Sequence, residues 1–194
     1  MKVLAINGSP HEQGNTAALL AALMEHFDQA GWAGETIHLN KLSYRGCQGC
    51  MACKTKTDHC VILDDATRIY CDILAADVIL FGSPVYFFDV TGQFKQFFDR
   101  CYSFWGPNYK PRVPSGKTAV LVVPSGQDNA GLGHGVTERY GQFLRLFGFS
   151  EVESLVCPGL RGRPNAEKLG VFLERGRVLA DKLIFGYAQP TRCE

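Results

Sequence analysis

The sequence predicts a doubly wound α/β fold built around a five-stranded parallel sheet. Two observations carry this prediction. Short apolar runs rich in Val, Ile and Leu alternate along the chain with segments whose apolar residues recur at helical spacing. The apolar runs are nearly continuous, which is typical of strands buried on both faces, as a parallel sheet covered by helices requires.

Four of the predicted strands come from these continuous runs: 2–7 (KVLAIN), 77–83 (DVILFGS), 118–125 (TAVLVVPS) and 151–158 (EVESLVCP). A fifth run, at 34–40 (GETIHLN), alternates more clearly between apolar and polar residues. We therefore expect this strand at an edge of the sheet or with one face half covered.

The segments between the strands carry apolar residues three and four positions apart. They predict helices around 19–27, 94–105, 140–147 and 169–183, with a shorter candidate at 65–76. Alternating strands and helices imply right-handed crossovers, and five of each suit a flavodoxin-like three-layer sandwich with strand order 2-1-3-4-5.

The chain is expected to form one domain over 1–194, with a cysteine-containing insertion at about 45–62. A glycine-rich stretch at 125–135 is the one long segment that we expect to be flexible. It follows a predicted strand, at the edge where sheets of this kind bind ligands.

The composition excludes several function classes. The 20 basic and 19 acidic residues give a formal net charge of +1, and no charge block suggests a nucleic-acid site, a membrane-binding stripe or a strongly acidic electron carrier. The apolar run at the N-terminus has about five residues, fewer than the roughly 7–15 of a signal peptide, and no run approaches the ~18 of a membrane span. We therefore expect a cytoplasmic protein.

The loop after the first strand, INGSPHEQGNT at 6–16, carries donors suited to a phosphate group. It lacks the lysine of a nucleotide-binding P-loop and the G-x-G-x-x-G spacing of a dinucleotide-binding turn. Ser9, Asn15 and Thr16 have short donor side chains, and the following helix adds backbone N–H groups and a partial positive charge. These features predict a monophosphate bound without Mg²⁺, such as that of FMN. The alternative is that Asn15 or Thr16 only caps the helix.

Two further loops follow strands at the same edge of the predicted sheet. In the order 2-1-3-4-5, ligands bind between the first and third strands, outside their carboxyl ends. The loop after the third strand is expected to flank an isoalloxazine ring with Pro84, Val85, Tyr86 and Phe87. We expect Phe88 to pack in the core instead. Ser125 and Gly126 would bring backbone groups to the polar edge of the ring.

The motifs GSPHEQGNT and GSPVYFFDVTGQFKQFFDR, with the strand spacing, resemble the NADPH-dependent FMN reductase-like branch of the flavodoxin superfamily. The resemblance covers nearly the whole chain and implies FMN as cofactor. It implies that Ser9, Asn15 and Thr16 hold the FMN phosphate and that the SPVY loop packs on the flavin. It also implies a homodimer or homotetramer with each flavin near a neighbouring subunit.

Two other features of these motifs bear on the site. His11 stands where relatives often carry arginine, and we retain it as a candidate phosphate contact. Lys95, Asp99 and Arg100 match a recurring pattern of the family. We expect a structural role for them, because Lys95 and Asp99 are spaced as an i,i+4 helix pair.

Four of the eight cysteines form the pattern C-x2-C-x2-C-x6-C: Cys47, Cys50, Cys53 and Cys60. The two short steps place three thiolates around one centre, and the six-residue excursion lets the fourth return to it. Zinc more often uses two separated C-x2-C pairs, so the spacing favours one [4Fe–4S] cluster. The motif resembles that of the iron–sulfur flavoproteins within the same flavin family. Alternatives are a redox-active pair of Cys50 and Cys53, or a hairpin at an interface.

The remaining cysteines are not expected to take part in this chemistry. Cys71 and Cys101 are predicted to be inert core residues on apolar helix faces, and no function is assigned to Cys157 or Cys193.

The sequence thus predicts an FMN-dependent oxidoreductase in which the flavin, and no side chain, carries the chemistry. Electrons would pass from a ferredoxin-like donor through a [4Fe–4S] cluster and FMN to a small acceptor such as a quinone or an oxygen species. One alternative is a cluster-free NAD(P)H-dependent FMN or quinone reductase. Another is a non-catalytic redox sensor with zinc or disulfide chemistry at the cysteines.

Overall fold

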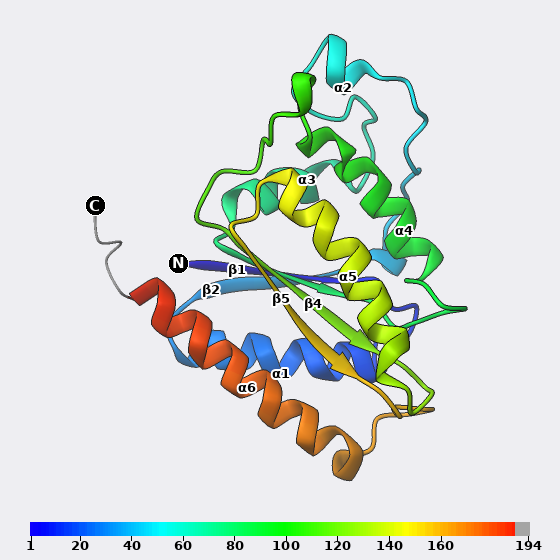
Figure 1. Cartoon of the computed structure of the whole chain (residues 1–194), viewed down its shortest axis with the longest axis vertical. Coiled ribbons are helices and arrows are strands. Elements are labelled where there is room, and N and C mark those ends of the chain that lie inside the picture. Colours follow the sequence, from blue (N-terminus) through cyan, green and yellow to red (C-terminus); the bar gives the residue numbers. More distant parts are fainter. Residues whose placement is uncertain (189–194) are drawn as a thin grey trace.

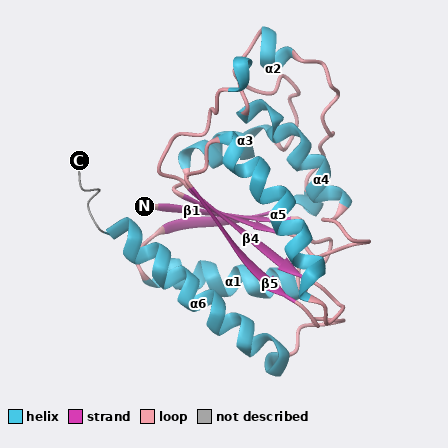
Figure 2. Ribbon diagram, in the orientation of Figure 1, coloured by secondary structure: helices cyan, strands magenta, loops and turns pink. Residues whose placement is uncertain are grey.

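A computed structural model describes residues 1–188 and has the predicted parallel sheet at its centre (Figure 2). The five strands are β1 (Lys2–Asn7), β2 (Ala33–His38), β3 (Val78–Gly82), β4 (Thr118–Pro124) and β5 (Glu151–Cys157). Their order is β2-β1-β3-β4-β5, and every neighbouring pair is parallel. The predicted fold class and strand order are confirmed.

The helices form the outer layers on the two faces of this sheet. They are α1 (Asn15–Gln29), α2 (Ala52–Thr55), α3 (Thr67–Ala75), α4 (Gly92–Phe98), α5 (Ala130–Phe147) and α6 (Ala166–Ala188). Three short 3₁₀ turns are η1 (Leu39–Lys41), η2 (Asp99–Phe104) and η3 (Pro107–Tyr109). In Figure 1, α1 and α6 lie side by side below the sheet, and α3, α4 and α5 cover its other face.

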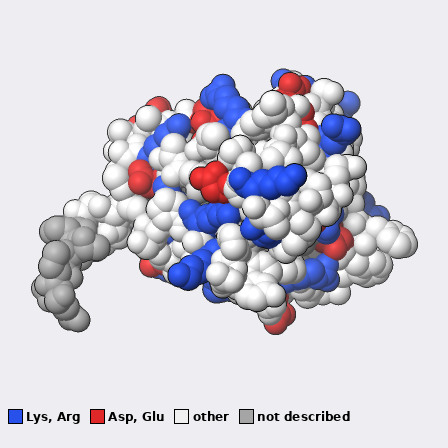
Figure 3. Space-filling view, turned by 90° about the horizontal axis from the view of Figure 1, so that it is seen from above, with Lys and Arg blue, Asp and Glu red and all other residues white. Residues whose placement is uncertain are grey.

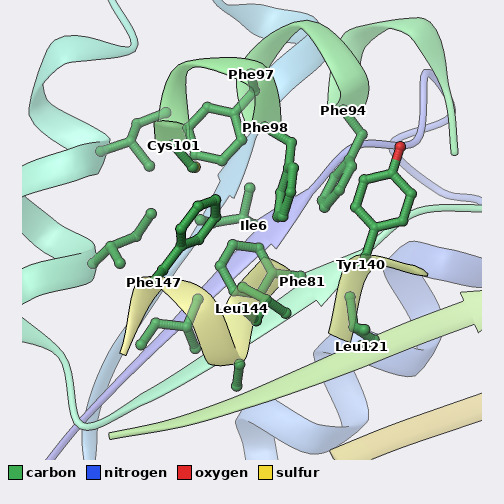
Figure 4. Packing of buried hydrophobic residues seen from close by; sticks show 14 of the residues in the cluster. Ile6, Phe81, Phe94, Phe97, Phe98, Cys101, Leu121, Tyr140, Leu144 and Phe147 are labelled. Carbon is green, nitrogen blue, oxygen red and sulfur yellow. The ribbon is translucent and has the colours of Figure 1, made fainter. Parts of the chain in front are cut away.

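The sheet separates two hydrophobic clusters, one on each face. The cluster beneath α3, α4 and α5 is rich in aromatic residues, with Phe81 of β3 packed edge-on against Phe94 and Phe98 (Figure 4). The cluster beneath α1 and α6 is mainly aliphatic. Every residue of β3 and β4 is buried, as central parallel strands should be, whereas β2 at the edge is partly exposed.

The glycine-rich stretch differs from the prediction of a long flexible segment. Only 125–129 is a loop, and α5 begins at Ala130, where the Asn129 side chain accepts a hydrogen bond from Gly131 N at 2.9 Å. A Cβ at Gly133 would lie 2.5 Å from a methyl carbon of Val156, so glycine allows α5 to approach β5. This close packing outweighs the low helix propensity of the glycines.

Two side chains were assigned to the core wrongly. Cys71 is exposed on the outer face of α3, because this helix buries Ile69, Tyr70 and Ile73 instead. Cys101 is buried, as predicted. Phe88 is 64% exposed rather than packed beneath its loop. Cys157 is buried, and Cys193 lies outside the described residues. Within 1–188 there is no helix with the length and apolar character needed to cross a membrane.

Candidate functional site

A cavity of about 1060 Å³ lies at the carboxyl edge of the sheet, where the loops after β1, β3, β4 and β5 meet. The strand arrowheads in Figure 1 point to this edge. Parallel strands place their carboxyl ends together, so loops that are distant in sequence share one site. The cavity brings together nearly all the predicted flavin contacts: Ser9, His11, Asn15, Thr16, Pro84, Val85, Tyr86, Ser125 and Gly126.

The loop after β1 is held by its own hydrogen bonds. Asn7 Oδ1 accepts from Ser9 N at 2.9 Å, and Ser9 Oγ accepts from His11 N at 3.1 Å. A further backbone bond of 3.1 Å joins Gly14 N to His11 O. Ser9 is buried, whereas His11 is exposed at the rim. These hydrogen bonds fix the shape of the loop.

The start of α1 leaves donors open toward this cavity. Its N-cap is Gly14, so neither Asn15 nor Thr16 is the capping residue. Within residues 1–188, no protein acceptor is found for the N–H groups of Asn15, Thr16 and Ala17. The residue Thr16 is 2% exposed and lines the cavity. Unpaired N–H groups at a helix N-terminus favour an anion, and the set is suited to a monophosphate.

Asn15 makes different side-chain contacts from those expected of a phosphate ligand. Its amide nitrogen donates to the carbonyls of Leu160 and Gly162, both at 3.1 Å. Its Oδ1 is buried and has no hydrogen-bond partner in the described chain. The side chain therefore fixes the β5–α6 loop against the loop after β1. The donor of Asn15 that remains available to a ligand is its backbone N–H.

The loops after β3 and β4 are joined to each other and to β5. Val85 N donates to Pro124 O at 2.9 Å, and Ser125 N donates to Cys157 O at 3.0 Å. The Ser125 hydroxyl donates to Gln127 O at 3.1 Å, and a Cβ at Gly126 would lie 3.8 Å from Arg161 Cα in the β5–α6 loop. These contacts fix the loops after β3 and β4 relative to each other at one side of the cavity.

Phe87 is the predicted flavin contact that does not line the cavity. Backbone bonds in both directions between Tyr86 and Asp89 close a tight turn. Its central residues, Phe87 and Phe88, have φ of 48° and 70°, in the left-handed region that non-glycine residues seldom adopt. This turn directs Phe87 outward, where it is 97% exposed.

The β5–α6 loop was missed by the sequence reasoning, although Leu160 and the segment from Arg161 to Pro164 line the cavity. It carries no recognisable motif. The one indication in the sequence is that it follows a fifth parallel strand, whose carboxyl end lies at the same edge of the sheet. Arg161 and Arg163 bring positive charge to this edge. The negative charge of Glu12 on the same rim is paired with Lys41 at 2.9 Å.

The four clustered cysteines line a second cavity of about 120 Å³, on a lobe that includes α2 and lies beyond α3 and α4 in Figure 1. Cys47 and Cys50 are exposed, and Cys53 and Cys60 are half-buried. The pKa of Cys53 is raised, mainly by burial and further by the other three thiols, so the four groups interact. In the described part of the chain, the cysteines are free thiols, and no His, Cys, Asp or Glu group is already arranged around a metal position.

Three cations hold this lobe. Arg112 Nη1 donates to the carbonyls of Cys53, Asp58 and Ser103 at 2.8 to 2.9 Å. Lys54 Nζ donates to the carbonyls of Tyr102 and Trp105 and lies 3.6 Å from the centre of the Tyr102 ring.

The third cation, Arg100, forms a buried ion pair with Asp64, with Nη1 at 2.7 Å from a carboxylate oxygen. Burial alone would raise the pKa of Asp64, but hydrogen bonds from Arg100 and backbone N–H groups outweigh it and hold this pKa below its usual range. The expected pair of Lys95 and Asp99 is present on the surface.

Comparisons with known proteins agree with this architecture. Residues 1–151 match the family described as NADPH-dependent FMN reductase. An iron-sulfur flavoprotein from Archaeoglobus fulgidus is 39% identical over 131 residues, which is 68% of this chain and 62% of that protein. An iron-sulfur flavoprotein from Methanocaldococcus jannaschii is 32% identical over 131 residues, covering 68% and 65% of the two chains. The chain thus spans less than two thirds of the length of these relatives.

The fold is shared with a solved NAD(P)H:quinone oxidoreductase from Methanothermobacter marburgensis. The TM-score is 0.75 at 20% identity, with 94% of this chain and 96% of that chain covered. The match to the family over most of the chain and the shared architecture lead to one conclusion. The chain belongs to the NADPH-dependent FMN reductase family and has a flavodoxin-like fold.

Proposed function

We propose that this protein is an iron–sulfur flavoprotein, in which Cys47, Cys50, Cys53 and Cys60 hold a [4Fe–4S] cluster and the cavity at the sheet edge holds FMN. The observation that carries the proposal is that the four cysteines line one cavity on a flavin-type fold. The names of the relatives from Archaeoglobus and Methanocaldococcus support it.

The residues at the sheet edge suit FMN. The free N–H groups at the start of α1, with the hydroxyls of Ser9 and Thr16, would hold the phosphate. Pro84, Val85 and Tyr86 would lie against the ring, and the backbone at 125–126 would meet its polar edge. When bound, FMN supplies hydride and single-electron chemistry. The protein's part is to bind and orient the cofactor, so no side chain is required as a nucleophile.

The cysteine cavity suits an iron–sulfur cluster in donor type and number. Four thiolates are the ligand set of a [4Fe–4S] centre, which exchanges single electrons. Cys53 and Cys60 lie on the half-buried side of this cavity, and Cys47 and Cys50 on its exposed side. Arg100, Arg112 and Lys54 surround the lobe and offset the negative charge that four thiolates would bring.

The donor that we propose is a ferredoxin-like one-electron carrier, and the acceptor is a small molecule. Figure 3 views the molecule from the side of α2, and Lys and Arg predominate over Asp and Glu on that face. A basic face favours an acidic partner by electrostatic complementarity. The alternative is a cluster-free enzyme that oxidises NAD(P)H. The exposed Arg161 and Arg163 at the flavin cavity favour that reading, since they could contact a nucleotide phosphate.

Cofactor analysis of the full chain purified without air tests the proposal. We expect one FMN and about four irons per chain, from the composition of a [4Fe–4S] cluster. Stoichiometric zinc would instead indicate a structural metal. FMN without metal, together with rapid NAD(P)H oxidation, would indicate the cluster-free reductase. A protein that binds neither flavin nor metal would contradict both readings.

A further inference from the structure

Arg100 is a fully buried arginine whose Nε atom makes no hydrogen bond within residues 1–188. It lies in η2, directly after α4, and none of its side-chain surface is exposed. Nη1 donates to both Asp64 oxygens at 2.7 Å and to Arg45 O at 3.2 Å, and Nη2 donates to Ile62 O at 2.9 Å. Nε is buried and has no hydrogen-bond partner within residues 1–188. A buried N–H of a charged group that makes no hydrogen bond destabilises the folded protein, so we expect an acceptor near Nε.

The acceptor that the surroundings offer is a cysteine sulfur. Arg100 lines the same cavity as the four clustered cysteines. Its Nη2 holds the carbonyl of Ile62, two residues after Cys60, so the guanidinium lies alongside this part of the chain. Burial would lower the pKa of Arg100, but interactions with Asp64, Tyr70 and Cys60 outweigh it and raise this pKa. Arg100 and Cys60 line the same cavity, and the direction of this pKa change agrees with an interaction between them.

We propose that Arg100 donates its Nε–H to the sulfur of Cys60 when that sulfur is a cluster ligand, and that it thereby raises the reduction potential of the cluster. The inference rests on the proposed function, because it concerns the metal that the cysteines would hold. A hydrogen bond and a positive charge at a ligand sulfur stabilise the more negative, reduced form of such a centre. Arg100 is on this account a positioning residue.

The other two cations of the lobe differ from Arg100 in a way that permits a matched control. Arg112 and Lys54 bond backbone carbonyls, and neither lines the cysteine cavity. Replacing Arg112 therefore tests the loss of hydrogen bonds to the backbone of the lobe, without the loss of a donor in the cysteine cavity. Replacing Arg100 by lysine keeps the positive charge that faces Asp64 but removes the Nε donor.

The test uses the full chain, purified without air, as wild type, Arg100→Lys, Arg112→Lys and Asp64→Asn. Iron and FMN are quantified, and the midpoint potential of the cluster is followed by EPR. We expect Arg100→Lys to retain FMN and to show a potential lower by about 59 mV or more, equivalent to a tenfold shift in a one-electron equilibrium. Arg112→Lys should keep the wild-type potential, and Asp64→Asn, which retains Nε, should not lower it.

The outcomes separate this inference from the proposed function. Wild-type protein without iron would contradict both. Iron in the wild type, with equal potentials in wild type and Arg100→Lys, would overturn the inference alone, as would an equal fall in Arg112→Lys.

A second measurement applies if Arg100→Lys fails to fold or loses its iron. Wild-type protein labelled with ¹⁵N at arginine Nε is reduced and examined by pulsed EPR. We expect a nitrogen coupling that persists in Arg112→Lys. Absence of any such coupling would overturn the inference.

Discussion

The side chain of Asn15, at the start of α1, donates a hydrogen bond of 3.1 Å to the carbonyl of Leu160, beyond the end of β5. A second bond of 3.1 Å reaches Gly162 O. These contacts join the first and last loops of the cavity across 145 positions of sequence. The side chain of Asn15 therefore holds the β5–α6 loop, whereas the neighbouring residues are the ones proposed to bind the phosphate.

Replacing Asn15 by alanine should loosen the β5–α6 loop. Two neutral hydrogen bonds contribute about 1–3 kcal/mol, partly offset because the buried, unpartnered Oδ1 is also removed. We expect the free energy of unfolding in urea to fall by about 1 kcal/mol. Hydrogen exchange at 160–162 should become faster. Unchanged exchange in this loop would show that the two bonds do not hold it in solution.

Replacing Thr16 by valine should weaken FMN much more than riboflavin. The substitution keeps the buried shape of Thr16 but removes the hydroxyl proposed to contact the phosphate. A hydrogen bond to a charged group contributes about 1.5–3 kcal/mol, which is roughly tenfold or more in Kd. Fluorescence titration of the apoprotein with both flavins measures the difference. Equal losses for the two flavins would remove Thr16 from the phosphate site.

Gly133 and Gly135 offer a matched pair within α5. A Cβ at Gly133 would lie 2.5 Å from Val156, whereas a Cβ at Gly135 meets nothing within 4 Å. Gly133→Ala should therefore destabilise the protein by about 1–3 kcal/mol through overpacking. Gly135→Ala should stabilise it by up to about 1 kcal/mol through helix propensity. Urea unfolding of both variants is the measurement, and changes of the same sign would contradict the packing argument.

The exposed aromatic turn beside the cavity at the sheet edge suggests self-association. Phe87 and Phe88 are 97% and 64% exposed on a strained backbone, an arrangement that a subunit interface would account for. We propose a homodimer or homotetramer and expect light scattering at micromolar concentration to show it. Phe87→Ser should shift the mass toward the monomer, and Val171→Ser, at an exposed position on α6, should not. A monomeric mass for the wild type would contradict the proposal.

The sequence was sufficient for the sheet because four strands are nearly continuous apolar runs and the fifth, β2, alternates as a half-covered edge strand does. It was insufficient where local preference and tertiary packing disagree. The glycines at 131, 133 and 135 disfavour a helix, yet Asn129 caps α5 and Gly133 permits contact with Val156.

The loops after β1, β3 and β4 were found because each carries donors or aromatic residues in a recognisable order. The β5–α6 loop was missed because its link to Asn15 depends on three-dimensional contact. The outward direction of Phe87 could not be predicted either. Left-handed turns are usually recognised by glycine or asparagine, and this turn contains neither.

We propose that the four clustered cysteines hold iron independently of the flavin. The most direct measurement is the ratio of iron to FMN in anaerobically purified Cys53→Ala, with Cys71→Ala as control, since Cys71 is exposed on α3 and does not line the cysteine cavity. We expect Cys71→Ala to retain about four irons per FMN. Cys53→Ala should lose its iron and keep FMN, because the two cavities share no lining residue. Equal iron content in the two variants, or its absence from both the wild type and Cys71→Ala, would contradict the claim.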